Sequence, residues 1–213
     1  MAQKIAVIDY GMGNLRSVSK AVEHVAGDAE VRVTDDPEFI AAADRVVFPG
    51  QGAARDCMAA IGKHHLNQAV LQAAHSKPFL GICMGLQVLM QRSEENGGTE
   101  LLGLFAGQVR RFDGLAMGDN GLPLKIPHMG WSPVNQVVEH PLWEGIADAT
   151  RFYFVHSYRV VPEDVSVVAA TTDYGVRFTS AIARDNLFAT QFHPEKSADA
   201  GLQLLRNFVN WRA

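Results

Sequence analysis

The feature that most constrains the fold is an alternation of short apolar runs with helix-type segments along the first part of the chain. Apolar runs at 4–9, 30–34, 45–48 and 77–82 have the length of buried strands. The segments at 15–25, after Pro37 and at 66–75 have the spacing of apolar residues that helices show. Because strands that alternate with helices usually join into a parallel sheet, this pattern predicts an α/β fold.

The pattern changes after Gly97 and Gly98. Short β-type runs follow at 133–138, 151–155, 165–171, 180–184 and 187–191 and predict an antiparallel or mixed region. Helices are expected at 84–92 and 198–211. A length of 213 residues suits one filled core. We therefore expect a single domain over residues 1–213, with a three-layer, flavodoxin-like fold around a central, mostly parallel sheet.

Charge and composition exclude several classes of function. The net charge is −4, and the 19 basic residues form no stripe that could neutralise a run of phosphates, so nucleic acid is not an expected partner. Asp9, Gly11 and Gly13 interrupt the apolar start, which argues against a signal or a membrane span. The two cysteines, Cys57 and Cys83, make neither a disulfide framework nor a four-ligand metal site. We expect a cytoplasmic protein without metal or cofactor, and a buried structural role for Cys57.

Cys83 lies between two glycines where a predicted strand turns directly into a helix. This spacing is typical of a nucleophile elbow, in which a strained turn exposes the nucleophile. The positive end of the helix dipole favours the thiolate, and the backbone N–H of Met84 would face a developing oxyanion. The alternative is a small buried residue at a tight turn, as many free cysteines are.

A cysteine nucleophile needs an imidazole, and the imidazole needs an orienting acid. His193 ends an apolar β-type run, and Glu195 follows two residues later, across Pro194. The bend at Pro194 would let Glu195 reach the ring nitrogen that faces away from Cys83. The alternative is a surface histidine with Glu195 as a first-turn helix acid. Four other histidines are interpreted as surface residues: His64, His65, His75 and His140.

Three segments together resemble the class I glutamine amidotransferases: Gly-Ile-Cys-Met-Gly-Leu-Gln at 81–87, Pro-Gly-Gln-Gly at 49–52 and Phe-His-Pro-Glu at 192–195. Within that family, the segments at 9–17, 127–131 and 154–158 are similar to the glutaminase subunits of imidazole glycerol phosphate synthases. The likeness covers essentially the whole chain.

The resemblance implies that Cys83 attacks the side-chain amide of glutamine to form a glutamyl thioester, that His193 moves the protons, and that Glu195 orients His193. It also implies oxyanion donors at Met84 and in the loop of Gly50 and Gly52, where Gln51 replaces a smaller apolar residue of many relatives. Four further residues match positions that hold the glutamine: Gln87, Glu95, Ser157 and Tyr158. For Glu95 a solvated helix-end charge is the alternative.

The resemblance further implies a heterodimer with a (β/α)8-barrel cyclase. That partner would use the ammonia to make imidazole glycerol phosphate and aminoimidazole carboxamide ribotide in histidine biosynthesis. The expected docking residues are Asn14, Arg16, His128 and Trp131, with a core position as the alternative for Trp131. Three other functions stay open: an amidotransferase for chorismate, purine or carbamoyl phosphate chemistry, a stand-alone hydrolase of γ-glutamyl compounds, and a non-catalytic regulatory subunit.

Overall fold

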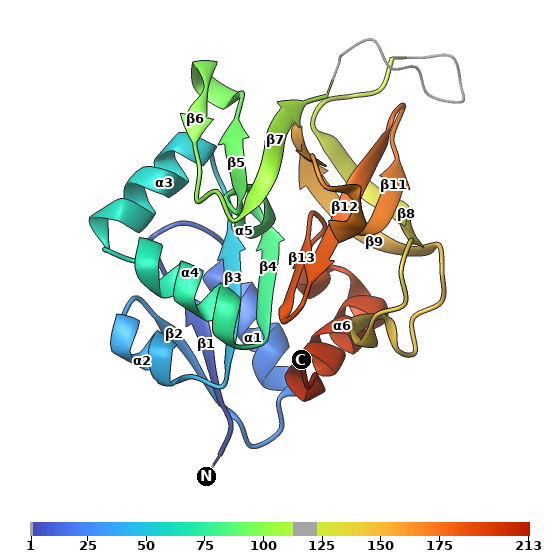
Figure 1. The fold of residues 1–213 in the computed structure, drawn as a ribbon. Helices are drawn as coiled ribbons and strands as arrows, with labels where there is room; N and C mark the ends of the chain where they lie inside the picture. The colour runs from blue at the N-terminus through green and yellow to red at the C-terminus, as the bar shows by residue number, and fades with distance from the viewer. Residues whose placement is uncertain (1, 113–122) are drawn as a thin grey trace.

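A computed structural model describes residues 2–112 and 123–213. Within these ranges, strands join into one large sheet with the order β2-β1-β3-β4-β13-β12-β10-β7-β5-β6 along its main path (Figure 1). β11, β8 and β9 extend it from β12. The strands are β1 (Lys4–Ile8), β2 (Glu30–Thr34), β3 (Arg45–Gly50), β4 (Phe79–Cys83), β5 (Met90–Ser93), β6 (Thr99–Glu100), β7 (Phe105–Arg111), β8 (His128–Gln136), β9 (Thr150–His156), β10 (Tyr158–Pro162), β11 (Val168–Asp173), β12 (Arg177–Arg184) and β13 (Leu187–Thr190).

The helices of the described ranges cover both faces of this sheet. They are α1 (Leu15–Val25), α2 (Pro37–Ala42), α3 (Ala54–Lys63), α4 (Asn67–Ser76), α5 (Met84–Gln87) and α6 (Ala198–Asn210). Short 3-10 turns lie at Glu95–Gly97, Pro141–Trp143, Val165–Val167 and Pro194–Lys196. Within the described ranges, no helix combines the length and the apolar character needed to cross a membrane.

The central strands confirm the predicted parallel sheet. β2, β1, β3, β4 and β13 pair in parallel in that spatial order. Gly50 of β3 pairs with Cys83 of β4, so the carboxyl ends of neighbouring strands meet at one edge. In open α/β sheets this edge is where ligands bind. Most pairings beyond β13 are antiparallel, as the sequence pattern predicted.

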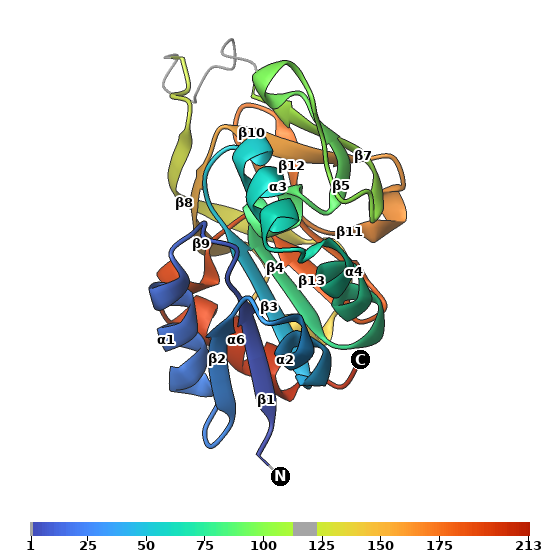
Figure 2. The ribbon, with the colours of Figure 1, turned by 90° about the vertical axis from the view of Figure 1, so that its left-hand side faces the viewer.

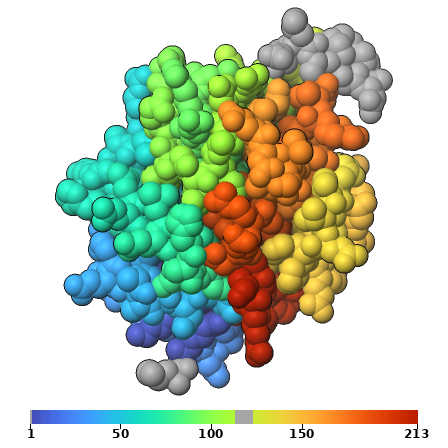
Figure 3. Space-filling model, in the orientation of Figure 1, coloured from blue at the N-terminus to red at the C-terminus, as the bar shows by residue number. Residues whose placement is uncertain are grey.

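Two apolar clusters fill the space between the layers. One packs α2, α3 and α4 against one face of the sheet, and the other packs α1 and α6 against the opposite face (Figure 2). The amphipathic faces predicted by the sequence account for this arrangement: Phe208 of α6 is fully buried, and Val22 of α1 is too. In the surface view, segments from both halves of the chain lie side by side on one face (Figure 3). The fold is a three-layer α/β arrangement.

Two local predictions differ from the structure. The helix expected at 84–92 ends at Gln87, and the chain then enters β5, which pairs with β7 and β6. An apolar run fits either a helix or a strand, and here pairing with β7 decides. The segment before Asn67 contains the helix α3, for which no prediction was made; it begins at Ala54 and buries Cys57 and Ile61.

Candidate active site

Cys83 ends β4 and precedes α5 in a conformation that few non-glycine residues adopt, with φ of +56° and ψ of −107°. The flanking glycines are required by packing. A Cβ at Gly85 would overlap the carbonyl oxygen of Phe48, and a Cβ at Gly81 would lie 2.9 Å from the Cβ of Ala189. Tight packing on both sides therefore holds the strained turn in place.

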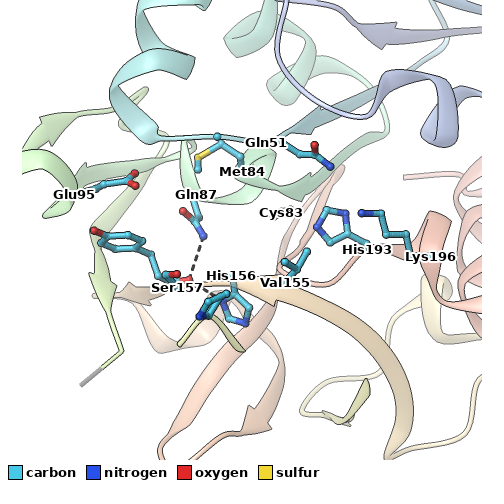
Figure 4. A pocket seen from close by; sticks show the side chains of 13 residues that line it. Gln51, Cys83, Met84, Gln87, Glu95, Val155, His156, Ser157, His193 and Lys196 are labelled. Carbon is cyan, nitrogen blue, oxygen red and sulfur yellow. Dashed lines mark hydrogen bonds between the residues drawn. The ribbon is translucent and has the colours of Figure 1, made fainter. Parts of the chain in front are cut away.

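Cys83 is only 7% exposed, so the expectation of an openly exposed nucleophile is wrong. It instead lines a cavity of about 440 Å³ (Figure 4). β4 has a neighbouring strand on each side, β3 and β13, and Cys83, at its carboxyl end, pairs with Gly50 of β3. The cavity is lined by Gln51, Gly52, Cys83, Met84, Gln87, Glu95, Pro127, Val155, His156, Ser157, Tyr158, His193 and Lys196.

His193 and Glu195 are hydrogen-bonded to each other. The 3-10 turn that begins at Pro194 folds Glu195 back, and its Oε1 lies 2.8 Å from Nδ1 of His193. Both side chains are almost fully buried. The backbone N–H of His193 also donates to the Tyr153 carbonyl at 2.9 Å, and Ser197 Oγ donates to the His193 carbonyl at 2.6 Å. Because Nδ1 is engaged, Nε2 is the ring nitrogen left for Cys83.

Nε2 of His193 is buried and has no hydrogen-bond partner among the described residues. Burial alone lowers the pKa of His193, but the nearby Cys83 thiolate and the Glu195 carboxylate outweigh burial and raise the pKa to about 10. The ring therefore carries a proton at neutral pH when Cys83 is ionised. A cysteine beside a histidine whose other ring nitrogen is held by a carboxylate is the arrangement that nucleophilic cysteine catalysis uses.

Gln87 and Glu95 lie along the same cavity, with Gln87 between Glu95 and His193 in the view of Figure 4. Both N–H groups of the Gln87 amide are engaged: Nε2 donates to the Tyr158 carbonyl at 3.2 Å and to Gln191 Oε1 at 2.9 Å. Its Oε1 is thus the atom available to a ligand. Glu95 Oε2 accepts from the backbone N–H of Ala54 at 2.7 Å, so this residue also caps α3, a contact that no local pattern predicted.

The end of β3 and the loop that follows it lie beside Cys83. A Cβ at Gly50 would overlap the Tyr10 hydroxyl and lie 2.9 Å from Met84 Cβ, so only glycine fits there. Gly52 has a φ of +100°, which also favours glycine. The Cys57 thiol donates to the Gln51 carbonyl at 3.3 Å. Burial raises the pKa of Cys57 to about 11, so this fully buried residue stays a neutral thiol.

The four residues expected at a docking face occupy different environments. Trp131 is 46% exposed, which excludes the core position, and Arg16 is exposed. Asn14 is half-buried and caps α1 through a hydrogen bond from the Ser17 N–H at 3.4 Å. His128 is only 1% exposed, so its side chain cannot contact a partner directly. The prediction for His128 is therefore wrong, because its ring stacks on Phe154 and Tyr174 beneath β8.

His140 also differs from the expected surface position. Its ring packs against Phe188 and Trp211, with centroid distances of 4.7 and 4.9 Å, and its Nδ1 accepts from the Leu142 N–H at 3.1 Å. Burial lowers the pKa of His140 to about 4. His65 and His75 are exposed and His64 is half-buried. Sequence reasoning missed four residues near the site: Val155, His156, Gln191 and Lys196.

Comparisons with known proteins identify the family of the chain. The model of the family "Glutamine amidotransferase class-I" matches residues 6–211. Imidazole glycerol phosphate synthase subunit HisH of Dechloromonas aromatica is 61% identical, over 99% of this chain and 97% of the relative. The HisH subunit of Thiobacillus denitrificans is 60% identical, over 99% and 92%.

Two solved structures share the fold at low sequence identity. PurLQS from Thermotoga maritima superposes with a TM-score of 0.73 at 17% identity, covering 99% of both chains. A second structure, described as a glutamine amidotransferase, has a TM-score of 0.66 at 18% identity and covers 97% of both chains. At this identity the likeness concerns the fold alone.

Proposed function

The chain belongs to the class I glutamine amidotransferase family, and from that premise we propose that it is the glutaminase subunit of an imidazole glycerol phosphate synthase. The observation that carries the proposal is that Cys83 and His193 line one cavity, with the buried Glu195 hydrogen-bonded to His193 behind it. The near-full-length relatives named as HisH subunits support the choice within the family. The substrate is glutamine, and the products are glutamate and ammonia.

The chemistry follows from the arrangement of the cluster. Cys83 Sγ attacks the side-chain carbonyl carbon of glutamine, and its electron pair forms the C–S bond. As the C–N bond breaks, the proton on His193 Nε2 passes to the leaving nitrogen, and ammonia departs. Water then attacks the thioester, His193 takes a proton from that water, and glutamate and the Cys83 thiolate are released. Glu195 holds Nδ1 throughout, so Nε2 keeps facing the reacting atoms.

Backbone groups at the cavity wall would stabilise the oxyanion of each tetrahedral intermediate. Met84 is the first residue of α5, next to Cys83; Gly50, the last residue of β3, pairs in register with Cys83, and Gly52 lines the same cavity. Fixed donors of this kind contribute about 3 kcal/mol each to transition-state stabilisation in acyl transfer. We assign the oxyanion donors to the segment of Gly50 and Gly52 and to Met84.

The cavity also offers opposite partners to the two charged ends of glutamine. Oε1 of Gln87 and the Glu95 carboxylate suit the α-ammonium group, and the Ser157 hydroxyl and the Tyr158 segment suit the α-carboxylate. These groups come from α5, the turn after β5 and the junction of β9 with β10. All of them line the cavity that Cys83 also lines, so we place the glutamine across it with its amide at Cys83.

Free ammonia protonates in neutral water and loses its nucleophilicity, so the ammonia must reach a synthase without passing through solvent. We propose that the ammonia is used by a (β/α)8-barrel cyclase subunit. This subunit would dock through exposed Trp131 and Arg16, with Asn14 close to that face. The products of the complex would be imidazole glycerol phosphate and aminoimidazole carboxamide ribotide. We place the complex in the cytoplasm.

The test is glutamate release from glutamine by the purified chain alone and then with the cyclase subunit and its nucleotide ligand. Strong stimulation by both is expected. The matched variant is Cys83→Ala in the complex, which should lose glutamine hydrolysis and keep cyclase activity with added ammonium. High turnover of the chain alone, unchanged by the cyclase, would identify a stand-alone hydrolase instead. Binding without any hydrolysis by the wild type would identify a regulatory subunit.

A further inference from the structure

Gln191 is a fully buried polar residue for which the proposed mechanism has no use. It follows β13, and its backbone N–H donates to the Ser180 carbonyl at 2.8 Å. Its side-chain Nε2 lies 3.6 Å from Cys83 Sγ, within hydrogen-bonding distance for sulfur. Its Oε1 lies 2.9 Å from Nε2 of Gln87. A buried amide destabilises the fold unless both its oxygen and its NH2 group are hydrogen-bonded, and the contact with Cys83 Sγ supplies a partner for the NH2 group.

The orientation of the Gln191 amide follows from a backbone atom. The Tyr158 carbonyl can only accept, so Gln87 must present its NH2 group to it. The same NH2 group faces Gln191, which must therefore present its oxygen to Gln87. The NH2 group of Gln191 is then directed at Cys83. No other amide orientation satisfies all three contacts.

The Tyr158 carbonyl also accepts a hydrogen bond from the first of two neutral imidazoles that are hydrogen-bonded in series. His156 Nδ1 donates to it at 2.8 Å, and His128 Nδ1 donates to His156 Nε2 at 2.9 Å. Ser132 Oγ lies 2.8 Å from His128 Nε2 and donates to it. Burial lowers the pKa of His128 to about 4 and that of His156 to about 3, so each ring has the single N–H that this line of donors requires.

We propose that Gln191 is a catalytic residue whose side-chain N–H donates to the Cys83 thiolate, and that Gln87, the Tyr158 carbonyl and His156 position it. This inference rests on the proposed function, in which Cys83 is the nucleophile. No proton leaves Gln191. Its hydrogen bond stabilises the thiolate before attack, weakens when the sulfur becomes part of the thioester, and strengthens again when the thiolate leaves during hydrolysis.

Other titratable groups also act on Cys83, and the test must separate them from Gln191. The imidazolium of His193 faces the sulfur from the segment after β13, and the charges of Cys83, Tyr10 and Cys57 influence one another across β3 and α3. Glu95 and Lys196 share the cavity. None of these groups changes in a Gln191 variant, so a comparison at each pH isolates the amide.

The experiment is the rate of Cys83 alkylation by iodoacetamide as a function of pH, resolved from Cys57 by peptide mapping. Gln191→Met has a similar shape without the donor, and Gln191→Glu replaces the donor with a negative charge. A hydrogen bond to a charged group corresponds to about a tenfold change in thiolate population. The Gln191→Met profile should therefore move about one pH unit upward, with about tenfold slower alkylation on its rising limb and the wild-type rate on its plateau.

The Gln191→Glu profile should move further in the same direction, and this order distinguishes a donor role from loosened packing. Gln203→Met, on the outer side of α6, is the control and should match the wild type. If Gln191→Met does not fold, the alkylation profile of Gln191→Glu is compared with that of the wild type instead. Superimposed profiles for the wild type and a folded Gln191 variant would overturn the inference. Failure of the proposed function would appear separately, as a wild-type complex that does not hydrolyse glutamine.

Discussion

The buried pair of His128 and His156 makes the stability of the fold sensitive to mild acid. His128 is 1% exposed and His156 is 6% exposed, and the two rings are hydrogen-bonded to each other. Burial lowers the pKa of both residues, to about 4 and about 3. In the unfolded chain each ring takes up a proton at its ordinary pKa of 6.5. The stability that the two neutral rings contribute to the folded state is therefore complete above pH 6.5 and is lost as the pH falls toward 4.

The magnitude follows from proton linkage. Between these limits the unfolded state binds one more proton per histidine than the folded state, so the free energy of unfolding falls by about 1.4 kcal/mol per pH unit for each ring. The pair together gives a slope of about 3 kcal/mol per pH unit, a large fraction of typical domain stability. His193 does not mask the effect. The pKa of His193 is raised, so the stability that its charged ring contributes is complete below pH 6.5 and is lost only as the pH rises toward 10.

The assay is urea unfolding followed by tryptophan fluorescence at several pH values between about 6.5 and 4.5. The double variant His128→Gln/His156→Gln should show a slope smaller by about 3 kcal/mol per pH unit than the wild type. His75→Gln is the matched control, since this ring is exposed. Equal slopes in the wild type and a folded double variant would refute the assignment of buried, neutral imidazoles.

Two further predictions concern the end of β3 and the docking face. Gly50→Ala should destabilise the fold by about 1–3 kcal/mol in urea unfolding and reduce glutamate release, because its Cβ would overlap the Tyr10 hydroxyl. Adding Tyr10→Phe should recover part of the stability, and no recovery would contradict this account. Trp131→Ala should weaken binding to the cyclase subunit about 30-fold in calorimetry, as loss of an interface anchor does. Val165→Ala, which changes an exposed residue far along the chain, should leave that affinity unchanged.

The parallel part of the fold could be predicted because its signals are local. Each apolar run has the length of a strand, and each intervening segment has a helical period, so β1 to β4 and α6 lie where the sequence predicted them. The prediction of a helix failed after Gln87, because Val88, Leu89 and Met90 are all fully buried and therefore show no helical alternation of buried and exposed residues. Such a run has no period. Pairing of Met90 with Phe105, a contact outside any local window, decides that the chain becomes a strand.

The same distinction applies to the candidate site. Glycines around Cys83 and the two-residue step from His193 to Glu195 are visible in the sequence, so the residues of the triad could be nominated before the structure. The amide of Gln191 could not, because its two side-chain partners are 104 and 108 residues away. A buried glutamine next to a histidine motif resembles any polar residue at a strand end. The orientation of the Gln191 amide follows only from the Tyr158 carbonyl of β10, which accepts from Gln87 and so fixes which end of Gln87 faces Gln191. Candidate catalytic residues can thus be nominated from local patterns, whereas the residues proposed to orient them depend on which strands become neighbours.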